Sequence, residues 1–342
     1  MNLSTVSHPP LRLAIAGMGR IAEIQAEALA GQSALTWVAA CDPDASRATV
    51  CPAGVPFFRS LTEMLASTTC DAVLVSTPTD THFDVARQVI ASGRHLLLEK
   101  PAAVNPGEVQ RLRDLADSAG VLFQTAFHMS RGSETDWLAA HLAAAGPDHP
   151  RICGFASVFH DPLYLAGQFH PRAPSVLGSW VDSGINALSV LARFIPPESL
   201  TILAANFQRA SGQPVQDVQS HVTLTAPGMQ GTIHTDWTTD SGDKTTTLHL
   251  TNGQQWQLDH NQETATLWAS SQSPEAPSLT PPPVSVHHCQ RHPSRMVDHY
   301  LGVLADFAEA VRRNQSNAAL SLTLHQLLLD ARITLRSVSQ AS

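Results

Sequence analysis

A short glycine motif near the N-terminus constrains the fold of this chain more than any other feature. The stretch LRLAIAGMGRIAEIQAEALAG, residues 11–31, predicts a buried strand, a tight turn and a helix. Gly17, Gly19 and Ala22 form the pattern G-x-G-x-x-A at the turn. Gly17 permits the turn, Gly19 leaves room for a pyrophosphate, and Ala22 lets the helix pack closely on the strand. The phosphates of a dinucleotide would then lie at the helix N-terminus.

An acidic residue follows the next predicted strand. LTWVAAC, residues 35–41, ends directly before Asp42. A carboxylate in this place accepts hydrogen bonds from the adenosine ribose hydroxyls and repels a 2′-phosphate. The alternative is that Asp42 only caps the turn CDPDAS. We favour the ribose contact, and therefore expect NAD as the cofactor rather than NADP.

Strand and helix patterns keep alternating up to residue 126. The strands DAVLVSTP, RHLLLEKP and VLFQTAF alternate with the helices HFDVARQVIASG and PGEVQRLRDLADSAG. This alternation predicts an α/β fold of the Rossmann type, a doubly wound parallel sheet that binds ligands at the carboxyl ends of its strands. Polar residues follow three of these strands, and we expect them to line one crevice: Ser76, Thr77 and Pro78; Glu99, Lys100 and Pro101; His128, Met129, Ser130 and Arg131.

The second half of the chain has a different pattern. Residues 152–159 predict its first strand, and from residue 201 to 268 Thr alternates with apolar residues, with Gly or Pro at the turns. This is typical of an antiparallel sheet. The Pro-rich stretch 270–286 predicts a loop, and residues 295–315 and 321–338 predict amphipathic helices.

These patterns predict two domains and a C-terminal helical segment. Residues 1–126 would form the dinucleotide-binding domain, with the first ten residues as a loose tail. Residues 127–295 would form a substrate and oligomerisation domain with an open, mostly antiparallel sheet, and the helices of 296–342 would pack back on the first domain. The Thr-rich sheet face could be solvated or buried between subunits. We expect a homodimer or homotetramer built on it.

Composition narrows the possible partners. The 342 residues are 43% hydrophobic and 15% charged, with a net charge of -8. Because no basic cluster occurs, we expect no nucleic acid partner, and no apolar run predicts a membrane partner. The N-terminus does not resemble a signal peptide, and five scattered cysteines favour reduced thiols in the cytoplasm: Cys41, Cys51, Cys70, Cys153 and Cys289. HHCQRH, residues 287–292, lacks the rigid frame of a zinc site, so no metal is expected.

A carboxylate and an amide stand at the head of an apolar helix in GSWVDSGINALSVL, residues 178–191. Asp182 and Asn186 would both be explained if their side chains pointed into a pocket. The alternative is that Asp182 caps the helix and that Asn186 caps backbone groups.

These motifs together resemble the Gfo/Idh/MocA oxidoreductases, the family of glucose–fructose oxidoreductase and inositol dehydrogenase, over nearly the whole chain. The resemblance is carried by the glycine motif, by STPTDTH at 76–82, by LLLEKPAA at 96–103 and by the Asp182 motif. It implies that Lys100 is the active-site lysine and that Glu99 lies beside the nicotinamide ribose. The cofactor-binding residues would be Gly17, Met18, Gly19, Arg20, Ile21, Asp42, Ser76, Thr77, Pro78, His82, Glu99 and Lys100.

One branch of the family is similar in further detail. Most members carry Asp-x-x-x-His where this chain has Asp182 and Asn186; Asn there resembles the aldose 1-dehydrogenases for L-arabinose and D-galactose. HTDWTT, residues 234–239, resembles an Asp-Trp motif of that branch, although Trp237 is more typical of a core residue. A Glu-Asp pair of the branch is replaced here, and a His-Pro is displaced, so the sugar-facing wall is altered. The candidate wall residues are His128, Arg131, His160, Asp161 and His170.

The resemblance implies an NAD(P)-dependent dehydrogenase that acts on CH–OH of a sugar, most simply on C1 of an aldose to give a lactone. Asp182 would take the hydroxyl proton, Lys100 would stabilise the developing charge, and Asn186 would orient the ring. Two alternatives stay open: a dehydrogenase of inositol, an amino sugar or another polyol, and a non-catalytic sugar sensor that holds a dinucleotide. The presence of both Lys100 and Asp182 argues against the sensor.

Overall fold

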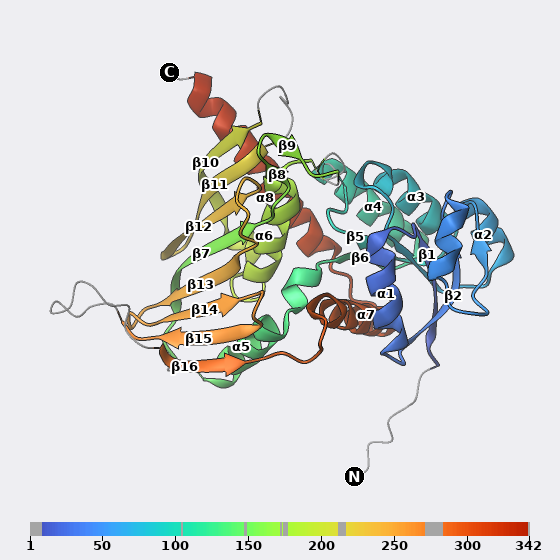
Figure 1. The fold of residues 1–342 in the computed structure, drawn as a ribbon, viewed down its shortest axis with the longest axis horizontal. Helices are drawn as coiled ribbons and strands as arrows, with labels where there is room; N and C mark the ends of the chain where they lie inside the picture. The colour runs from blue at the N-terminus through green and yellow to red at the C-terminus, as the bar shows by residue number, and fades with distance from the viewer. Residues whose placement is uncertain are drawn as a thin grey trace, which may run out of the picture. The chain divides into compact units, whose positions relative to one another are not determined.

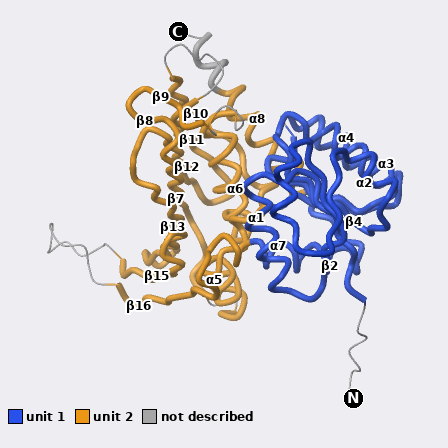
Figure 2. Tube along the Cα trace, turned by 45° about the vertical axis from the view of Figure 1, so that its right-hand side comes forward, with its two compact units in different colours: residues 1–126, 300–319 blue, residues 127–299, 320–342 orange. Residues whose placement is uncertain are grey.

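A computed structural model of the chain describes residues 9–103, 105–146, 149–171, 173, 177–210, 217–270 and 283–340, with side chains up to residue 334 (Figure 1). The expected N-terminal tail and most of the Pro-rich loop lie outside these residues. The chain divides into two compact units, coloured separately in Figure 2. Unit 1 comprises Met1–Ala126 and Tyr300–Ala319, and unit 2 comprises Phe127–His299 and Leu320–Ser342.

Unit 1 is built on a parallel sheet of six strands in the order β3-β2-β1-β4-β5-β6. Its core strands are continuous apolar runs because helices cover both faces of such a sheet. The predicted doubly wound sheet is confirmed. The strands are β1 (Leu11–Ala16), β2 (Leu35–Cys41), β3 (Phe57–Phe58), β4 (Ala72–Val75), β5 (His95–Glu99) and β6 (Phe123–Ala126), and the helices between them are α1 (Arg20–Ala30), α2 (Leu61–Ser67), α3 (His82–Ala91) and α4 (Pro106–Ala119).

Local sequence accounts for the ends of α4. The Asn105 side chain accepts a 3.0 Å hydrogen bond from the N–H of Glu108, and Pro106 occupies the first helical turn. Gly120 ends the helix with a left-handed φ of 64°. Asn, Pro and Gly are the residues that favour these three positions.

Unit 2 contains an eight-stranded sheet in the order β10-β11-β12-β7-β13-β14-β15-β16. Every neighbouring pair is antiparallel except β7 and β12, which are parallel. The expected open, mostly antiparallel sheet is confirmed. Its strands are β7 (Ile152–His160), β10 (Thr201–Arg209), β11 (Asp217–Ala226), β12 (Met229–Asp236), β13 (Lys244–Leu250), β14 (Gln255–Asp259), β15 (Thr264–Trp268) and β16 (Pro283–His288); β8 (Tyr164–Leu165) and β9 (Gln168–Phe169) form a separate pair.

Two details of this sheet differ from the sequence analysis. The first strand of the unit, β7, lies between β12 and β13 and so interrupts the meander. Residues 283–286 were assigned to the Pro-rich loop, but they begin β16, which pairs with β15. The assignment was wrong because the prolines before Val284 hid a short alternating run that ends at His288.

Helices cover one face of the unit 2 sheet, as Figure 1 shows for α5 (Ser133–Ala144), α6 (Ile185–Leu191) and α8 (Ala318–Gln340). Apolar residues that alternate along the strands share one core with these helices; among them are Phe155, Phe159, Val222, Ile233, Leu248, Leu188, Leu324 and Leu328. Because side chains alternate between faces, the intervening residues point to the opposite, open face. The open face carries Thr223, Thr232, Thr247 and Gln257.

The two C-terminal helices have different partners. Helix α7 (Arg295–Arg313) contributes its residues from Tyr300 onward to unit 1. Helix α8 instead packs on unit 2, where Leu327 and Ala331 belong to the core of the sheet. Both helices were predicted to pack on the first domain, and this prediction is wrong for α8. An apolar stripe predicts that a helix has a buried face, but it does not specify which surface covers that face.

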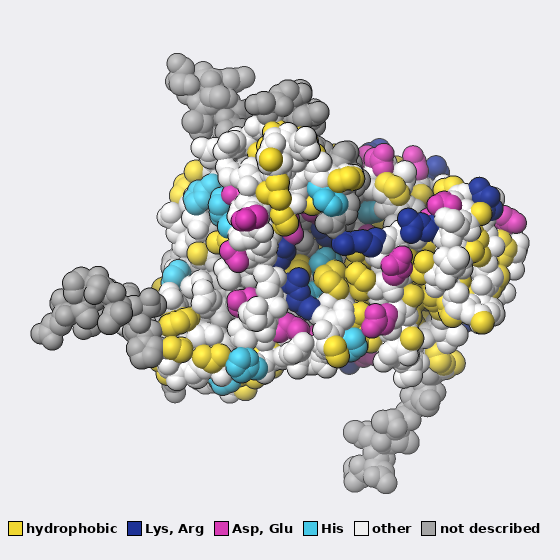
Figure 3. Space-filling model, viewed as in Figure 1, with side chains coloured by type: hydrophobic (Ala, Val, Ile, Leu, Met, Phe, Trp, Pro, Cys, Tyr) yellow, Lys and Arg dark blue, Asp and Glu magenta, His cyan; other side chains and the backbone are white. Residues whose placement is uncertain are grey.

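The surface carries side chains of both charge signs, which are interspersed in the view of Figure 3. All five cysteines are free thiols. Within the described part of the chain, every helix is too short or too polar to cross a bilayer.

Candidate functional site

The glycine loop between β1 and α1 has the geometry of a phosphate cradle. Gly17 has a φ of 90°, and a Cβ there would lie 2.7 Å from the backbone of Ser76 and Thr77. Next to Gly19 the space is open, since a Cβ would meet no atom within 4 Å. Helix α1 begins at Arg20 without a side-chain cap. Its first N–H groups therefore suit an anion such as a pyrophosphate.

The carboxylate of Asp42 supports this loop. One oxygen accepts a 2.8 Å hydrogen bond from the N–H of Met18, and the other accepts a 2.9 Å bond from the N–H of Asp44. The turn-capping role and the ribose-binding role are therefore compatible. Each carboxylate oxygen has a second lone pair that can accept from a ribose hydroxyl.

A buried chain of hydrogen bonds ends at Glu99. The Ser76 hydroxyl donates to the Gln25 side chain at 2.9 Å, and the Gln25 amide donates to Glu99 Oε1 at 2.9 Å. The Tyr300 hydroxyl donates to the same oxygen at 2.5 Å, and the backbone N–H of Lys100 donates to Oε2 at 3.2 Å. Lys100 thus follows Glu99, whose carboxylate is fixed by hydrogen bonds from other residues of unit 1.

Burial dominates the titration of this pair. Burial raises the pKa of the Glu99 carboxyl, although the Tyr300 hydroxyl and the Lys100 charge favour its ionised form. Burial and the adjacent Glu99 also raise the pKa of Tyr300 well above its ordinary value. Burial therefore favours the neutral, protonated forms of both side chains.

Gln25 and Tyr300 were not predicted from the sequence as site residues. Gln25 is fully buried on the apolar face of α1, and a long polar residue at such a position was an available signal. Tyr300 belongs to the apolar stripe of α7, so its pattern indicated burial but gave no indication of Glu99.

His82 joins two of the loops that were expected to flank the cofactor. Its Nδ1 lies 2.8 Å from the Pro101 carbonyl, and its Nε2 lies 2.9 Å from the Thr77 carbonyl. Burial lowers the pKa of His82, so the neutral ring can donate only one of these bonds. The ring is 1% exposed, whereas Pro78 is exposed. His82 therefore positions the loops.

Asp182 lies in a π-helical turn, Trp180–Gly184, that leads directly into α6. A Cβ on Gly184 would lie 2.5 Å from the Trp180 ring, so glycine lets that ring pack beneath the turn. Single π-helical turns occur frequently at functional sites. The local sequence thus places the Asp182 carboxylate on an unusual backbone at the head of a buried helix.

Asp217 anchors the start of this turn. One carboxylate oxygen accepts from the N–H of Trp180 at 2.7 Å and from the Ser179 hydroxyl at 2.8 Å. The other accepts from Arg332 at 2.6 Å. Asp217 is 3% exposed and was not predicted from the sequence as a site residue. No local sequence pattern around Asp217 indicates that its carboxylate caps a helical turn 37 residues earlier in the chain.

Asn186 presents a buried acceptor on the next turn. Its amide nitrogen donates to the Asp182 carbonyl at 3.2 Å. Its side-chain oxygen is buried and has no hydrogen-bond partner among the described residues. Buried polar atoms are almost always paired, so this oxygen calls for a donor such as a ligand hydroxyl.

Two of the residues expected on the sugar-facing wall, His160 and Asp161, lie at the end of β7 and point in different directions. Asp161 accepts a 2.8 Å hydrogen bond from Ser183, within the turn that carries Asp182, and forms a 2.6 Å ion pair with Lys244. His160 points to the open face of the sheet, because its neighbour Phe159 is in the helix-covered core.

His170, a wall candidate, and Trp237, the tryptophan of the Asp-Trp motif, have different surroundings. His170 follows β9, and its N–H donates to the Leu163 carbonyl at 2.8 Å. Trp237 is fully buried in a small apolar cluster with Leu163 and Val218, which is the core position that its sequence context favoured.

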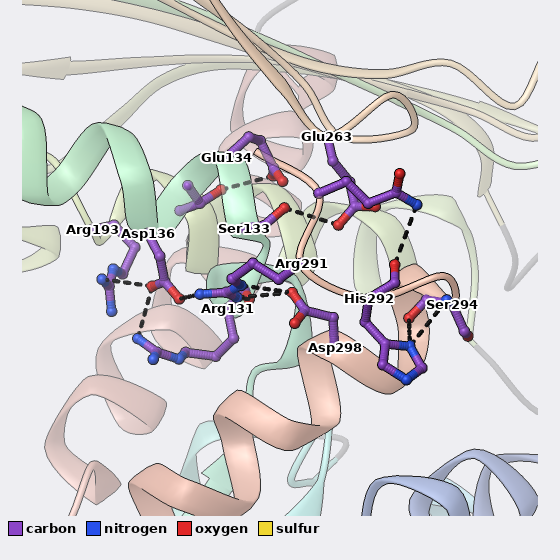
Figure 4. A network of polar contacts seen from close by, with 12 residues as sticks. Arg131, Ser133, Glu134, Asp136, Arg193, Glu263, Arg291, His292, Ser294 and Asp298 are labelled. Carbon is purple, nitrogen blue, oxygen red and sulfur yellow. Dashed lines mark hydrogen bonds and ion pairs between the residues drawn. The ribbon is translucent and has the colours of Figure 1, made fainter. Parts of the chain in front are cut away.

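Arg131 belongs to an ion-pair network in unit 2 (Figure 4). It lies 2.9 Å from Asp136, which also pairs with Arg193 and with Arg291 at 3.0 Å each. Arg291 in turn lies 2.8 Å from Asp298. This network holds the turn of residues 128–131 on its unit.

A buried titratable group lies beneath that turn. The ring of His299 stacks on His128 with 5.9 Å between centroids, and both of its nitrogens lack a hydrogen-bond partner within the described residues. Burial lowers the pKa of His299 to about 3. The ring is therefore neutral at physiological pH.

Comparisons with known proteins agree with this architecture. Residues 11–127 match a family model described as "Oxidoreductase family, NAD-binding Rossmann fold". The rhizopine catabolism protein MocA of Rhizobium meliloti is 31% identical over 117 residues, which are 34% of this chain and 37% of that protein. Galactose 1-dehydrogenase of Pseudomonas fluorescens is 29% identical over 197 residues, 55% of this chain and 58% of that protein. The match thus spans 37% of the length of MocA and 58% of the length of galactose 1-dehydrogenase.

The fold extends over almost the entire chain in a solved structure. D-galactose-1-dehydrogenase from Rhizobium etli superposes with a TM-score of 0.75 at 20% identity, covering 96% of each chain. At this identity the superposition shows a shared fold. Residues 11–127 thus form an NAD-binding Rossmann fold, and the chain is similar to the Gfo/Idh/MocA oxidoreductases.

Proposed function

We propose that the protein is an NAD-dependent dehydrogenase that oxidises a CH–OH group of a sugar, most directly C1 of an aldose to a lactone. One observation carries the proposal: the buried, unpartnered side-chain oxygen of Asn186 lies one helical turn from Asp182. A sugar hydroxyl would satisfy that oxygen, and a carboxylate nearby can take a proton.

The residues divide the chemistry between them. NAD, when bound, accepts the hydride, so the sugar carbon must also lose its hydroxyl proton. Asp182 takes this proton as the general base, and Lys100 stabilises the charge that develops on the oxygen. Asn186 does not titrate; it orients the ring through its acceptor oxygen. His128, Arg131 and His170 border the sugar, and Asp161 supports the turn that carries Asp182 through its hydrogen bond from Ser183.

The relatives support a sugar substrate. The match to galactose 1-dehydrogenase covers 197 residues. This is longer than the stretch of residues 1–126 that begins unit 1. It therefore includes part of unit 2, where Asp182 and Asn186 lie.

A second candidate is a dehydrogenase of inositol, an amino sugar or another polyol. Its support is the altered wall. The Asp161 carboxylate already forms an ion pair with Lys244 and accepts a hydrogen bond from Ser183, and His160 points to the other face of the sheet. A wall that lacks two polar contacts accepts a ring that differs from an aldose at those hydroxyls.

The test is NAD reduction, followed by absorbance, across pentoses, hexoses, inositols and amino sugars. On the best substrate, Asn186→Ala should raise KM with a small effect on kcat, because it removes contacts made in the ground state. The matched control is Asn206→Ala, an exposed position on β10. NAD binding without turnover of any sugar or polyol would contradict the proposal and favour a sensor.

A further inference from the structure

Three metal-ligating side chains meet on the open face of the unit 2 sheet. His160 ends β7, and His234 and Asp236 lie on the neighbouring parallel strand β12. In the register of these strands Asp236 pairs with His160, and His234 pairs with Val158. Since alternate residues share a face, all three side chains project away from the helices. Their ligand atoms all lie within 4.8 Å of one another.

The two imidazoles have the spacing of ligands on one ion. His160 Nε2 and His234 Nδ1 are 3.3 Å apart. Two nitrogens at about 2.0–2.1 Å from a tetrahedral zinc ion are also about 3.3–3.4 Å apart. Asp236 adds a carboxylate oxygen. Two imidazoles and one carboxylate form a known donor set for zinc and related ions, with the remaining position left to water.

Neighbouring residues hold these side chains in orientation. The Asp236 carboxylate accepts from the Gln219 amide at 2.7 Å and from the N–H of Thr238 at 2.6 Å. The Ser241 hydroxyl lies 3.4 Å from Nδ1 of His160. A proton on that Nδ1, donated to Ser241, leaves the lone pair of Nε2 directed at His234. Such outer contacts fix the tautomer and direction of metal ligands.

The local charges also suit a cation. The ammonium group of Lys244 donates to the His160 carbonyl at 2.9 Å. Its charge is balanced by Asp161 at 2.6 Å.

We propose that His160, His234 and Asp236 bind one divalent transition-metal ion of the zinc class. The ion would fasten the end of β7 to β12. The next residue, Asp161, contacts the turn that carries Asp182, so the ion would stiffen one wall of that region. An N–H···N hydrogen bond between the two imidazoles explains the same spacing without an ion, and the two explanations differ in what added metal should do.

The experiment uses the full chain, freed of metal with a chelator and then titrated with Co²⁺. Visible absorption should report one bound cobalt ion per chain, and added Zn²⁺ should displace it. The double variant His160→Ala/His234→Ala should lose the signal. His249→Ala should keep it, because His249 is an exposed histidine of the same face on β13. Gln219→Ala should weaken binding by about 10- to 100-fold, as expected for a contact that orients a ligand.

Two results would overturn the proposal. One is the absence of a cobalt signal in the wild type. The other is an undiminished signal in the double variant, which would place the ion at different histidines, such as His287 and His288. Circular dichroism and thermal melting establish that each variant folds. If the double variant does not fold, His234→Gln must lose the signal by itself, since its amide is a poor ligand for zinc.

Discussion

The hydroxyl of Tyr300 donates a 2.5 Å hydrogen bond to the carboxylate of Glu99, a residue 201 positions earlier in the chain. Both side chains belong to unit 1, and both are buried. Tyr300→Phe should therefore lower the free energy of unfolding by about 1–3 kcal/mol, because a buried acceptor loses its donor.

The loss in Tyr300→Phe should grow with pH. The pKa of Glu99 is raised in the folded state, so the stability that this group contributes is complete below its unfolded pKa and falls as pH rises through the folded pKa. Removing the hydroxyl raises that pKa further. Urea unfolding at pH 5, 7 and 8.5 measures the effect, with Tyr164→Phe as the control. An equal loss at every pH would contradict this account of Glu99.

Asp42 should determine the choice of dinucleotide. Asp42→Ser should narrow the preference for NAD over NADP by at least about tenfold, or about 1.4 kcal/mol, because the repulsion of the 2′-phosphate is lost. The measurement is kcat/KM with each cofactor. Asp44→Ser, two residues away and exposed, is the control. A wild-type enzyme that uses NADP better than NAD would refute this interpretation of Asp42.

Lys100 and Asp182 should act on kcat and not on cofactor binding. Lys100→Met and Asp182→Asn should each lower kcat by about 100- to 10,000-fold, the usual size of a proton-transfer contribution. The double variant should lose less than the product of the two factors, because residues that act as a unit fail together. NAD affinity, measured by fluorescence, should stay near the wild-type value.

Different outcomes would reassign each residue. A near wild-type kcat in Asp182→Asn would make Asp182 a helix cap. A parallel loss of NAD affinity and kcat in Lys100→Met would make Lys100 a residue that only holds the cofactor.

His299 should make the protein less stable in acid. Its pKa is lowered from 6.5 to about 3, so between these values the unfolded chain binds a proton that the folded chain does not. Stability should fall as pH drops below 6.5, by up to about 1.4 kcal/mol per pH unit. His299→Leu should remove this part of the slope, measured by urea unfolding from pH 4 to 7. His249→Leu, at an exposed position, should leave the slope unchanged.

The open face of the unit 2 sheet should mediate self-association. We expect a homodimer or homotetramer at micromolar concentration by light scattering. Thr232→Glu/Thr247→Glu should shift the mass toward the monomer, because two charges on a contact face must lose their hydration. Ala91→Glu, at an exposed position of α3, is the control. A monomeric wild-type protein would count against this surface as an interface.

The sequence allowed the sheet of unit 1 to be predicted because its signals are local. An apolar run, a glycine turn and an amphipathic helix repeat at short intervals, and crossover connections leave few arrangements for them. The central place of β7 could not be predicted in the same way. Alternation indicates a strand and its two faces, but the choice of pairing partner depends on segments far away in the sequence.

The residues of the candidate site likewise fall into two groups, those predictable from local sequence patterns and those that depend on distant contacts. Gly17, Gly19 and Asp42 follow a pattern of fixed spacing, so the sequence was enough to place them together. Asp217 and Tyr300 act on segments that lie far from them in the sequence. Their roles depend on tertiary contacts that neither periodicity nor composition contains.

The division of unit 1 into two stretches of chain has a consequence for biosynthesis. A ribosome completes residues 1–126 long before it reaches residues 300–319, which belong to the same unit. Until then the nascent sheet exposes the surface that α7 will cover, and Glu99 lacks the tyrosine that it meets in the finished fold. The first unit to begin folding is thus among the last to finish, and residues 127–299 of unit 2 are translated within that interval. A ribosome that stalls before residue 300 would release a chain with an open Rossmann core, a natural target for chaperones and proteases.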